Sequence, residues 1–204
     1  YKVKDERAFV FPNSLPDNEL RNNNGTQVIG YLGRLNKSKG VDILIEAFRI
    51  VCEKIPDAKL VITGSGSELP NLKLLAEKYS LKDRLSFNGA VSYSEILYFL
   101  SSISFLVVPS RIDNLPTVAL EALSVATPVI GSDAGGIPDI ISHGYNGLLF
   151  ENGNSKDLSE KMIMLLENRP IHNEMSVNAR SSFEKNFCMT QHRERFEQLI
   201  ESTI

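Results

Sequence analysis

The chain has 204 residues, a length that suits one large domain, and its formal net charge at pH 7 is −3. A negative balance leaves no basic surface for a phosphate backbone, which argues against a nucleic-acid partner. Hydrophobic residues make up 42% of the chain, yet no apolar run approaches the ~18 residues that span a bilayer, so we expect a soluble globular domain.

Predicted strands and helices alternate along the chain from residue 27 onward. Residues 1–26 show no sustained periodicity and contain Pro12 and Pro16, so we interpret them as a strand or tether followed by a linker. Short apolar runs predict strands at 28–33, 59–63, 84–88, 103–108, 128–131 and 147–150. Helical periodicity predicts helices at 41–54, 68–79, 93–101, 116–126, 155–168, 171–185 and 190–202, with a short helical piece at 137–141.

The predicted strands are nearly continuous apolar runs rather than alternating ones, as in Ile103–Val108. That composition is typical of a parallel sheet buried on both faces. Strands that alternate with helices therefore predict an α/β fold, a Rossmann-like, doubly wound parallel sheet, with extra helices at the C-terminus. We assign residues 27–185 to this domain.

Glycine or proline ends or directly follows five of the predicted strands, at Gly33, Gly64, Gly89, Pro109 and Gly131. Open parallel sheets bind ligands in the crevice outside the carboxyl ends of their strands. Glycine there allows a close approach of the backbone to a ligand, although turn geometry alone also explains single glycines. Five such turns at one edge favour a ligand site.

Three cations, Arg34, Lys37 and Lys39, lie on the loop after the first strand of the domain. Arginine offers a planar fork and lysine a point charge, so the loop suits a diphosphate; the alternative is a solvated loop. The stretch lacks the spacing of a P-loop. Leu69 stands three residues after Gly66, where a dinucleotide fingerprint needs glycine or alanine, which removes most support for hydride chemistry.

Two carboxylates, Asp113 and Glu121, flank the predicted start of the fourth helix. Pro116 suits the first helical turn, and Asn114 is a plausible cap. The carboxylates could act as an acid/base pair, or they could accept hydrogen bonds from ribose or sugar hydroxyls. The second role fits better beside a cationic loop and a helix N-terminus, which favours anions. An exposed helix carboxylate is the plain alternative for Glu121.

Thr117, Glu121 and Ser124 form one polar stripe on this otherwise apolar helix, and we predict that it faces a ligand. The histidines at 143, 172 and 192 follow no metal-ligand spacing, so no metal is expected.

Together these motifs resemble the C-terminal domain of a GT-B fold glycosyltransferase of the retaining family 4. The resemblance covers about residues 27–170 and rests on the combination of weak pieces. The matching stretches are Gly33-Arg34-Leu35 with Lys39-Gly40-Val41-Asp42, Val61-Ile62-x-Gly64-x-Gly66, Pro109-Ser110 through Leu120-Glu121-Ala122, and Gly135-Gly136-Ile137-Pro138-Asp139.

The resemblance implies roles for the site residues. Arg34 and Lys39 would bind the donor diphosphate, Glu121 the ribose hydroxyls, and Asp113 the donor sugar. Asp113 departs from the glutamate usual at that position, which leaves the identity of the sugar open. The other implied contacts are with Gly33, Gly64, Val91 and the turn residues Asn114, Leu115, Pro116 and Thr117.

The resemblance also implies partners. The donor would be a UDP-, GDP- or ADP-sugar, without cofactor or metal, and the acceptor a glycan or lipid held by an N-terminal domain that is missing here. Residues 1–26 would then end that domain and form the linker, and residues 186–204 would form the helix that crosses back. This fragment should bind donor and transfer nothing by itself.

Two other functions stay open: a nucleotide-sugar epimerase or glycan phosphorylase of the same fold, and a non-catalytic nucleotide-sugar-binding subunit. The N-terminus lacks a signal-peptide pattern, and Cys52 and Cys188 follow no metal spacing, so we expect a cytoplasmic protein with two ordinary thiols. Polysaccharide biosynthesis is the expected process, and peripheral association of the full-length protein with the inner face of the membrane stays open.

Overall fold

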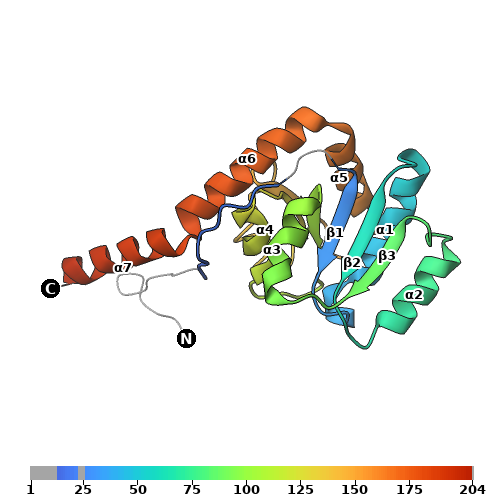
Figure 1. The fold of residues 1–204 in the computed structure, drawn as a ribbon, viewed down its shortest axis with the longest axis horizontal. Coiled ribbons are helices and arrows are strands. Elements are labelled where there is room, and N and C mark those ends of the chain that lie inside the picture. The colour runs from blue at the N-terminus through green and yellow to red at the C-terminus, as the bar shows by residue number, and fades with distance from the viewer. Residues whose placement is uncertain (1–12, 23–25, 204) are drawn as a thin grey trace.

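A six-stranded sheet forms the centre of the domain in the computed structural model, which describes residues 13–22 and 26–203. All of its neighbouring strands pair in parallel, and their order is β3-β2-β1-β4-β5-β6 (Figure 1). The predicted doubly wound parallel sheet is therefore confirmed. The strands are β1 (Val28–Leu32), β2 (Lys59–Thr63), β3 (Leu85–Gly89), β4 (Phe105–Val108), β5 (Val129–Ser132) and β6 (Gly147–Phe150).

The strand order reverses between β1 and β4. The chain winds outward from β1 through β2 to β3, then returns to place β4 on the other side of β1. The loops that follow β1 and β4 therefore diverge to opposite faces of the sheet and leave a crevice at the carboxyl ends of the two strands. This is the position at which open α/β sheets bind their ligands.

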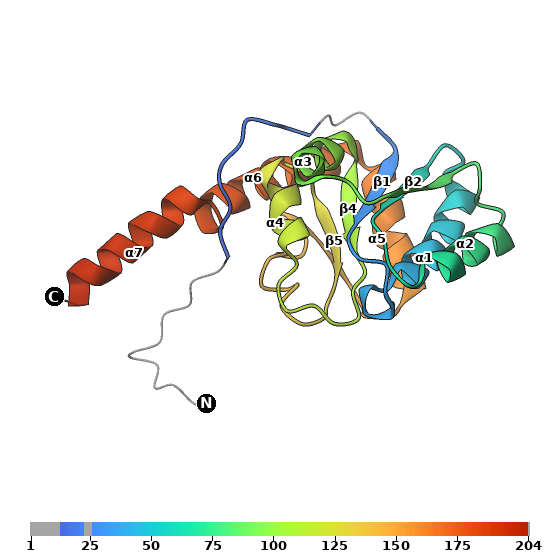
Figure 2. The same ribbon diagram turned by 60° about the horizontal axis from the view of Figure 1, so that its bottom comes forward.

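Two layers of helices cover the sheet. Figure 2 shows α1 (Val41–Lys54), α2 (Leu69–Lys78) and α5 (Ser155–Glu167) on one side, and α3 (Tyr93–Ser102), α4 (Thr117–Ser124) and α6 (Arg169–Asn186) on the other. Each layer packs against the sheet through its own cluster of buried apolar side chains. The sheet is buried on both faces, which explains the continuous apolar runs in its strands.

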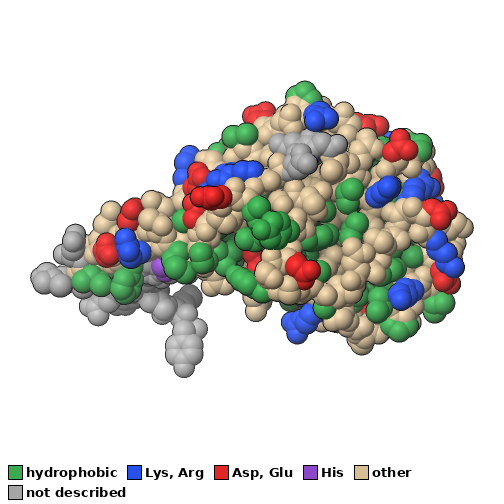
Figure 3. Space-filling model, viewed as in Figure 1, with side chains coloured by type: hydrophobic (Ala, Val, Ile, Leu, Met, Phe, Trp, Pro, Cys, Tyr) green, Lys and Arg blue, Asp and Glu red, His purple; other side chains and the backbone are tan. Residues whose placement is uncertain are grey.

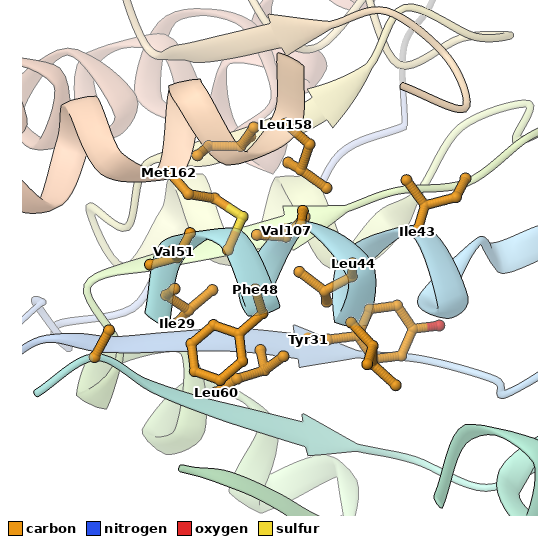
Figure 4. Close-up of a cluster of buried hydrophobic side chains, with 14 of the residues drawn as sticks. Ile29, Tyr31, Ile43, Leu44, Phe48, Val51, Leu60, Val107, Leu158 and Met162 are labelled. Atoms are coloured by element: carbon orange, nitrogen blue, oxygen red, sulfur yellow. The ribbon is translucent and has the colours of Figure 1, made fainter. Parts of the chain in front are cut away.

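The first of these clusters illustrates why α1 is a helix. Val41, Leu44, Phe48 and Val51 recur at intervals of three or four residues, and all four side chains are buried. Figure 4 shows Phe48 lying over Ile29 and Leu60 of β1 and β2. Burying a side chain of this size contributes about 1.5–3 kcal/mol.

The predicted helical piece at 137–141 is wrong. The amides of Ile140 and Ile141 both donate to the carbonyl of Ile137, at 3.0 Å each, which makes a turn rather than a helix. The Asn146 side-chain amide donates a hydrogen bond to the carbonyl of Ile140 at 3.0 Å. The amide of Gly144, which a further helical turn would direct to that carbonyl, donates instead to the carbonyl of Gly147 at 2.9 Å, so the chain leaves the helical path there.

The segment before the domain lies beside its C-terminal end. The amide of Leu15 donates to the carbonyl of Phe187, and the amide of Met189 donates to the carbonyl of Leu15, both at 2.9 Å. α7 (Met189–Thr203) then extends away from the sheet and its covering helices (Figure 1). The predicted helix at 190–202 is confirmed. The assignment of residues 1–26 to the end of another domain and a linker stays a prediction, and residues 1–12 and 23–25 of that range lie outside the described residues.

Apolar side chains are exposed on α7 and over α3 (Figure 3). Met189 on α7 is 51% exposed, and Tyr93 and Tyr98 on α3 are 76% and 64% exposed.

Across residues 13–22 and 26–203, no helix combines the length and the apolar character needed to cross a bilayer.

Candidate functional site

The loop between β1 and α1 forms one wall of the crevice. The Tyr31 hydroxyl donates to the carbonyl of Arg34 at 2.8 Å and so fixes the chain just beyond β1. A short 3-10 helix, η2 (Lys37–Lys39), follows, and the Asn36 side chain caps it by accepting from the amide of Lys39 at 3.2 Å. This turn directs Lys39 back toward the carboxyl end of β4.

The loop between β4 and α4 forms the facing wall. Asp113 Oδ2 lies 2.5 Å from Lys39 Nζ and accepts a hydrogen bond from the Ser110 hydroxyl at 3.2 Å. The side chains of Lys39 and Asp113 are only 21% and 13% exposed. The predicted cationic loop and the first predicted carboxylate therefore meet, and in this structure they neutralise each other.

α4 begins at Thr117, and its N-cap residue, Pro116, makes no side-chain capping bond. The interpretation of Asn114 as the cap is wrong, because Asn114 precedes the N-cap position by two residues. A capping side chain must start from the N-cap position to reach the amides of the first turn. The amide of Ala119 donates to the carbonyl of Pro116 at 3.0 Å, and the positive end of the helix, which has no side-chain cap, favours an anion outside it.

Two cavities lie side by side in the crevice. The first, which we call the Lys39 cavity, has a volume of about 270 Å³. The second, the Glu121 cavity, has a volume of about 320 Å³. They share five lining residues and so form one continuous groove across the switch point: Leu32, Gly33, Arg34, Thr117 and Val118.

The structure brings nearly all of the predicted site residues into this groove. Gly33, Arg34 and Thr117 line both cavities. Lys39, Asp113, Leu115 and Pro116 line the Lys39 cavity, while Gly64, Val91 and Glu121 line the Glu121 cavity. Asn114 is the exception, since its side chain is exposed and it is not among the residues that line either cavity.

The predicted polar stripe on α4 divides into two parts. Thr117 and Glu121 line the groove. Ser124 is buried, donates to the carbonyl of Glu121 at 2.7 Å and accepts from the Asn18 side chain at 3.0 Å. The prediction that Ser124 faces a ligand is therefore wrong, because the segment before the domain covers that end of the helix.

Lys37 lies apart from Arg34 and Lys39, the other two cations of its loop. It lines a different cavity of about 490 Å³, together with Asp42 and Arg111, between η2, α1 and α2. Only Arg34 and Lys39 of the three predicted cations line the groove. The η2 turn places successive side chains on different sides of the loop, which the order of residues alone does not show.

Sequence reasoning did not assign a role in the site to Tyr31, Ser110, Val118 or Ile96, all of which line the groove. Of these, Tyr31 could have been found from the sequence, because it carries a hydroxyl group and is the penultimate residue of an otherwise apolar strand, β1. Its ring packs in the core with Leu44, and its oxygen points away from the other labelled side chains (Figure 4).

Burial sets the protonation of two groups in the groove. Burial raises the pKa of the Tyr31 hydroxyl well above its usual value, and the nearby charge of Asp113 raises it further. Tyr31 therefore remains a hydrogen-bond donor at physiological pH. Burial also raises the pKa of Glu121. A ligand that donates hydroxyl hydrogens to the Glu121 carboxylate would offset this loss of hydration.

In the part of the chain that the structure describes, no group of three or more His, Cys, Asp or Glu side chains is arranged to hold a metal ion. The positive charge in the groove comes from Arg34, Lys39 and the N-terminus of α4.

Comparison with known proteins decides the family. The family model for glycosyl transferases group 1 matches residues 16–182. The chain belongs to this family. The resemblance to a GT-B C-terminal domain is thereby confirmed, together with the Rossmann-like fold.

This group 1 glycosyltransferase chain is 33% identical over 198 residues to an uncharacterized glycosyltransferase of Methanocaldococcus jannaschii, covering 95% of this chain and 54% of that protein. The crystal structure of the C-terminal domain of a group 1 glycosyl transferase from Francisella tularensis is 25% identical, with a TM-score of 0.75 over 83% of this chain and 89% of that one.

Anabaena HepE, crystallised with UDP and glucose, shares the fold, with a TM-score of 0.77 and 23% identity over 86% of this chain and 48% of HepE. The chain thus spans about half the length of the full-length glycosyltransferases that it matches.

Proposed function

We propose that this chain is the donor-binding domain of a retaining glycosyltransferase, which moves a sugar from a nucleoside diphosphate to a glycan or lipid acceptor. The observation that carries the proposal is the continuous groove at the switch point. One end holds Arg34, Lys39 and the uncapped start of α4, and the other end holds the half-buried Glu121 carboxylate.

The positive end of the groove suits a diphosphate. Arg34 offers a planar fork, Lys39 offers a point charge, and the amides at the start of α4 point toward an anion. These groups also stabilise the charge that develops on the nucleoside diphosphate when its bond to the sugar breaks. The proposed chemistry therefore needs neither a metal nor a cofactor.

The two carboxylates bind different parts of the donor. Glu121 accepts from the ribose hydroxyls, because it lies in the Glu121 cavity beside Gly64 and Val91, where the nucleoside fits. Asp113 binds the sugar, because it lies in the Lys39 cavity beside Ser110. The diphosphate bridges the shared wall at Gly33, Arg34 and Thr117, so one molecule fills both cavities.

The comparisons support this assignment without testing it residue by residue. HepE, which shares the fold, was crystallised in complex with UDP and glucose. The full-length relatives are about twice as long as this chain, so we place the acceptor site in the part that this chain lacks. By this proposal, residues 27–185 are the donor domain, residues 186–204 cross back to the acceptor domain, and the isolated chain does not transfer sugar.

We place the full-length enzyme in the cytoplasm and in polysaccharide biosynthesis. The two cysteines of this chain, Cys52 and Cys188, are buried and free, as is typical of a reducing compartment.

Calorimetric titration of the chain with UDP, GDP and ADP tests the proposal. We expect one of them to bind with a dissociation constant on the order of micromolar to millimolar, and Arg34→Ala to weaken it. Arg49→Ala is the control, since Arg49 pairs with Glu53 on α1 and does not line the groove. Absence of heat with all three nucleotides, at millimolar concentration, contradicts the proposal.

Two alternative functions would use the same groove. An epimerase of the same fold would use the nucleotide sugar without an acceptor, and a glycan phosphorylase would cleave a glycan with phosphate, so product analysis of the full-length protein distinguishes them from a transferase. A non-catalytic subunit would bind donor and show neither transfer nor slow hydrolysis of the donor.

A further inference from the structure

We propose that Arg111 is a positioning residue, which holds the two loops of the groove in register from outside while the donor separates Lys39 from Asp113. The proposal rests on the proposed function for its ligand, but its contacts are independent of it. Arg111 lies two residues before Asp113, yet it lines the cavity between η2, α1 and α2 and not the groove.

Arg111 binds the β1–α1 loop at two points and the start of α1 at a third. Its backbone amide donates to the carbonyl of Ser38 at 2.8 Å, and its Nη1 donates to the carbonyl of Lys37 at 2.8 Å. Its guanidinium also forms a two-pronged pair with Asp42, with Nη1 2.8 Å from Oδ1 and Nη2 2.6 Å from Oδ2. Lys39 stands between these anchor points in the chain, so Arg111 brackets it on both sides.

The charge of Asp42 is consistent with this role. Burial would raise the pKa of Asp42, but the hydrogen bonds and the charge of Arg111 outweigh it and keep the pKa below its usual value. Asp42 is therefore ionised at neutral pH and holds the planar fork of Arg111 at both oxygens. A lysine at position 111 could supply the charge but not the second prong.

The Lys39–Asp113 pair explains why a second connection between the two loops is needed. In this structure the pair joins the two loops inside the Lys39 cavity, with 2.5 Å between the charged atoms. No ligand atom fits between them at that distance. By this proposal, a donor that binds Lys39 through its diphosphate and Asp113 through its sugar separates the two side chains, whereas the contacts of Arg111 lie outside the groove and are kept.

The pair of Arg111 and Asp42 is half exposed, at 40% and 45% of the two side chains. Ion pairs at such exposure contribute little to the free energy of unfolding. Removing the pair should therefore loosen the groove without unfolding the domain, and this separates a positioning role from a purely structural one.

The experiment compares wild type, Arg111→Ala, Asp42→Ala and the double variant of this chain. Binding is measured by calorimetry with UDP, GDP and ADP, and hydrogen exchange is measured on peptides covering 34–42 and 109–116. Arg49→Ala is the matched control, because Arg49 pairs with Glu53 on the same helix at 2.5 Å, outside the groove. Thermal midpoints are recorded for all variants.

We expect each single variant to weaken the nucleotide that wild type binds by about threefold to tenfold, and the double variant to be no weaker than the singles. Exchange should rise in both loop peptides and stay unchanged in β2. Arg111→Lys should restore only part of the affinity. Arg49→Ala should match wild type in affinity while changing the midpoint by a similar amount to Arg111→Ala.

Wild-type affinity in Arg111→Ala, or additive losses in the double variant, would overturn the proposal. If wild type binds none of the three nucleotides, the proposed function is contradicted instead. The hydrogen-exchange measurement on the two loop peptides then tests the positioning role of Arg111. Unchanged exchange in the two loops then overturns the positioning role, and raised exchange in both supports it.

Discussion

Lys39 Nζ lies 2.5 Å from Asp113 Oδ2, although the two residues are 74 positions apart in the chain. The pair spans the switch point between β1 and β4, and both residues line the Lys39 cavity. Asp113 thus occupies one of the three N–H donors of the Lys39 ammonium. We therefore expect a diphosphate that binds Lys39 to compete with Asp113 for its charge, and the donor's binding free energy to include the weakening of this ion pair.

Replacing Asp113 with alanine tests this competition. Lys39 loses its partner and becomes free for phosphate, so we expect the affinity for the bare nucleoside diphosphate to stay equal or rise. The extra affinity from an attached sugar should disappear. Calorimetry with the nucleotide and the nucleotide sugar measures both quantities, with Asp57→Ala, an exposed change in the turn before β2, as the control.

Glu121→Ala should give the opposite pattern and weaken the bare nucleotide, because the ribose loses its acceptor. Equal loss of bare nucleotide in Asp113→Ala and Glu121→Ala would refute the division of roles between the two carboxylates.

Glu121 also predicts a pH dependence of stability. Burial raises the pKa of Glu121 in the folded state above its ordinary value of 4.5. Its contribution is therefore fully present below the pKa of the unfolded state and is lost as the pH rises through the folded pKa. Urea unfolding of wild type and Glu121→Gln should show wild type becoming less stable relative to the variant as the pH rises from 4 to 8.

The control for this titration is Glu174→Gln, which removes an exposed carboxylate from α6. A constant difference between wild type and Glu121→Gln across this range, or a relative gain by wild type, would show that burial does not penalise the Glu121 charge.

Gly135→Ala should displace the Asp113 turn. Gly135 has φ of +59°, and a Cβ atom there would lie 1.9 Å from the carbonyl oxygen of Asp113. Gly153 has a similar φ of +84°, but its Cβ would meet nothing within 4 Å. Gly153→Ala therefore measures the backbone strain alone, which costs about 1 kcal/mol.

We expect Gly135→Ala to lower the free energy of unfolding by more than Gly153→Ala does and to abolish nucleotide binding in calorimetry, whereas Gly153→Ala keeps it. Equal effects of the two variants would mean that the contact between Gly135 and the Asp113 turn does not position that turn.

Tyr31→Phe should loosen the Arg34 backbone while keeping the core. The variant removes the hydroxyl that donates to the Arg34 carbonyl at 2.8 Å, and the buried ring remains. We expect a loss of about 1 kcal/mol in the free energy of unfolding and a several-fold loss of nucleotide affinity. Tyr98→Phe, at a tyrosine that is 64% exposed on α3, should change neither.

Helical periodicity and apolar runs located every strand of the sheet and all seven α-helices to within about two residues. The parallel sheet followed from the continuous apolar runs, and the ligand edge followed from glycines at strand ends such as Gly33 and Gly64. These features are visible in a single sequence because they depend on the spacing of neighbouring side chains and on local backbone geometry.

The remaining features depend on which loops meet. Asn114 suits a cap by residue type, but the helix starts at Thr117 and leaves it outside the groove wall. Ser124 has the spacing of a site residue, but the segment at Asn18 covers it. Lys37 and Lys39 stand two residues apart, yet η2 directs them into different cavities.

Local chemistry thus determined the doubly wound domain, the switch-point edge and most of the residues that line the groove. Only the tertiary structure paired Lys39 with Asp113 and placed Arg111 outside the groove against Asp42. The physical reason is the strand order, which makes β1 and β4 neighbours although β2 and β3 lie between them in the chain. Contacts across such a crossover are set by the packing of whole layers and not by the spacing of residues along any one segment.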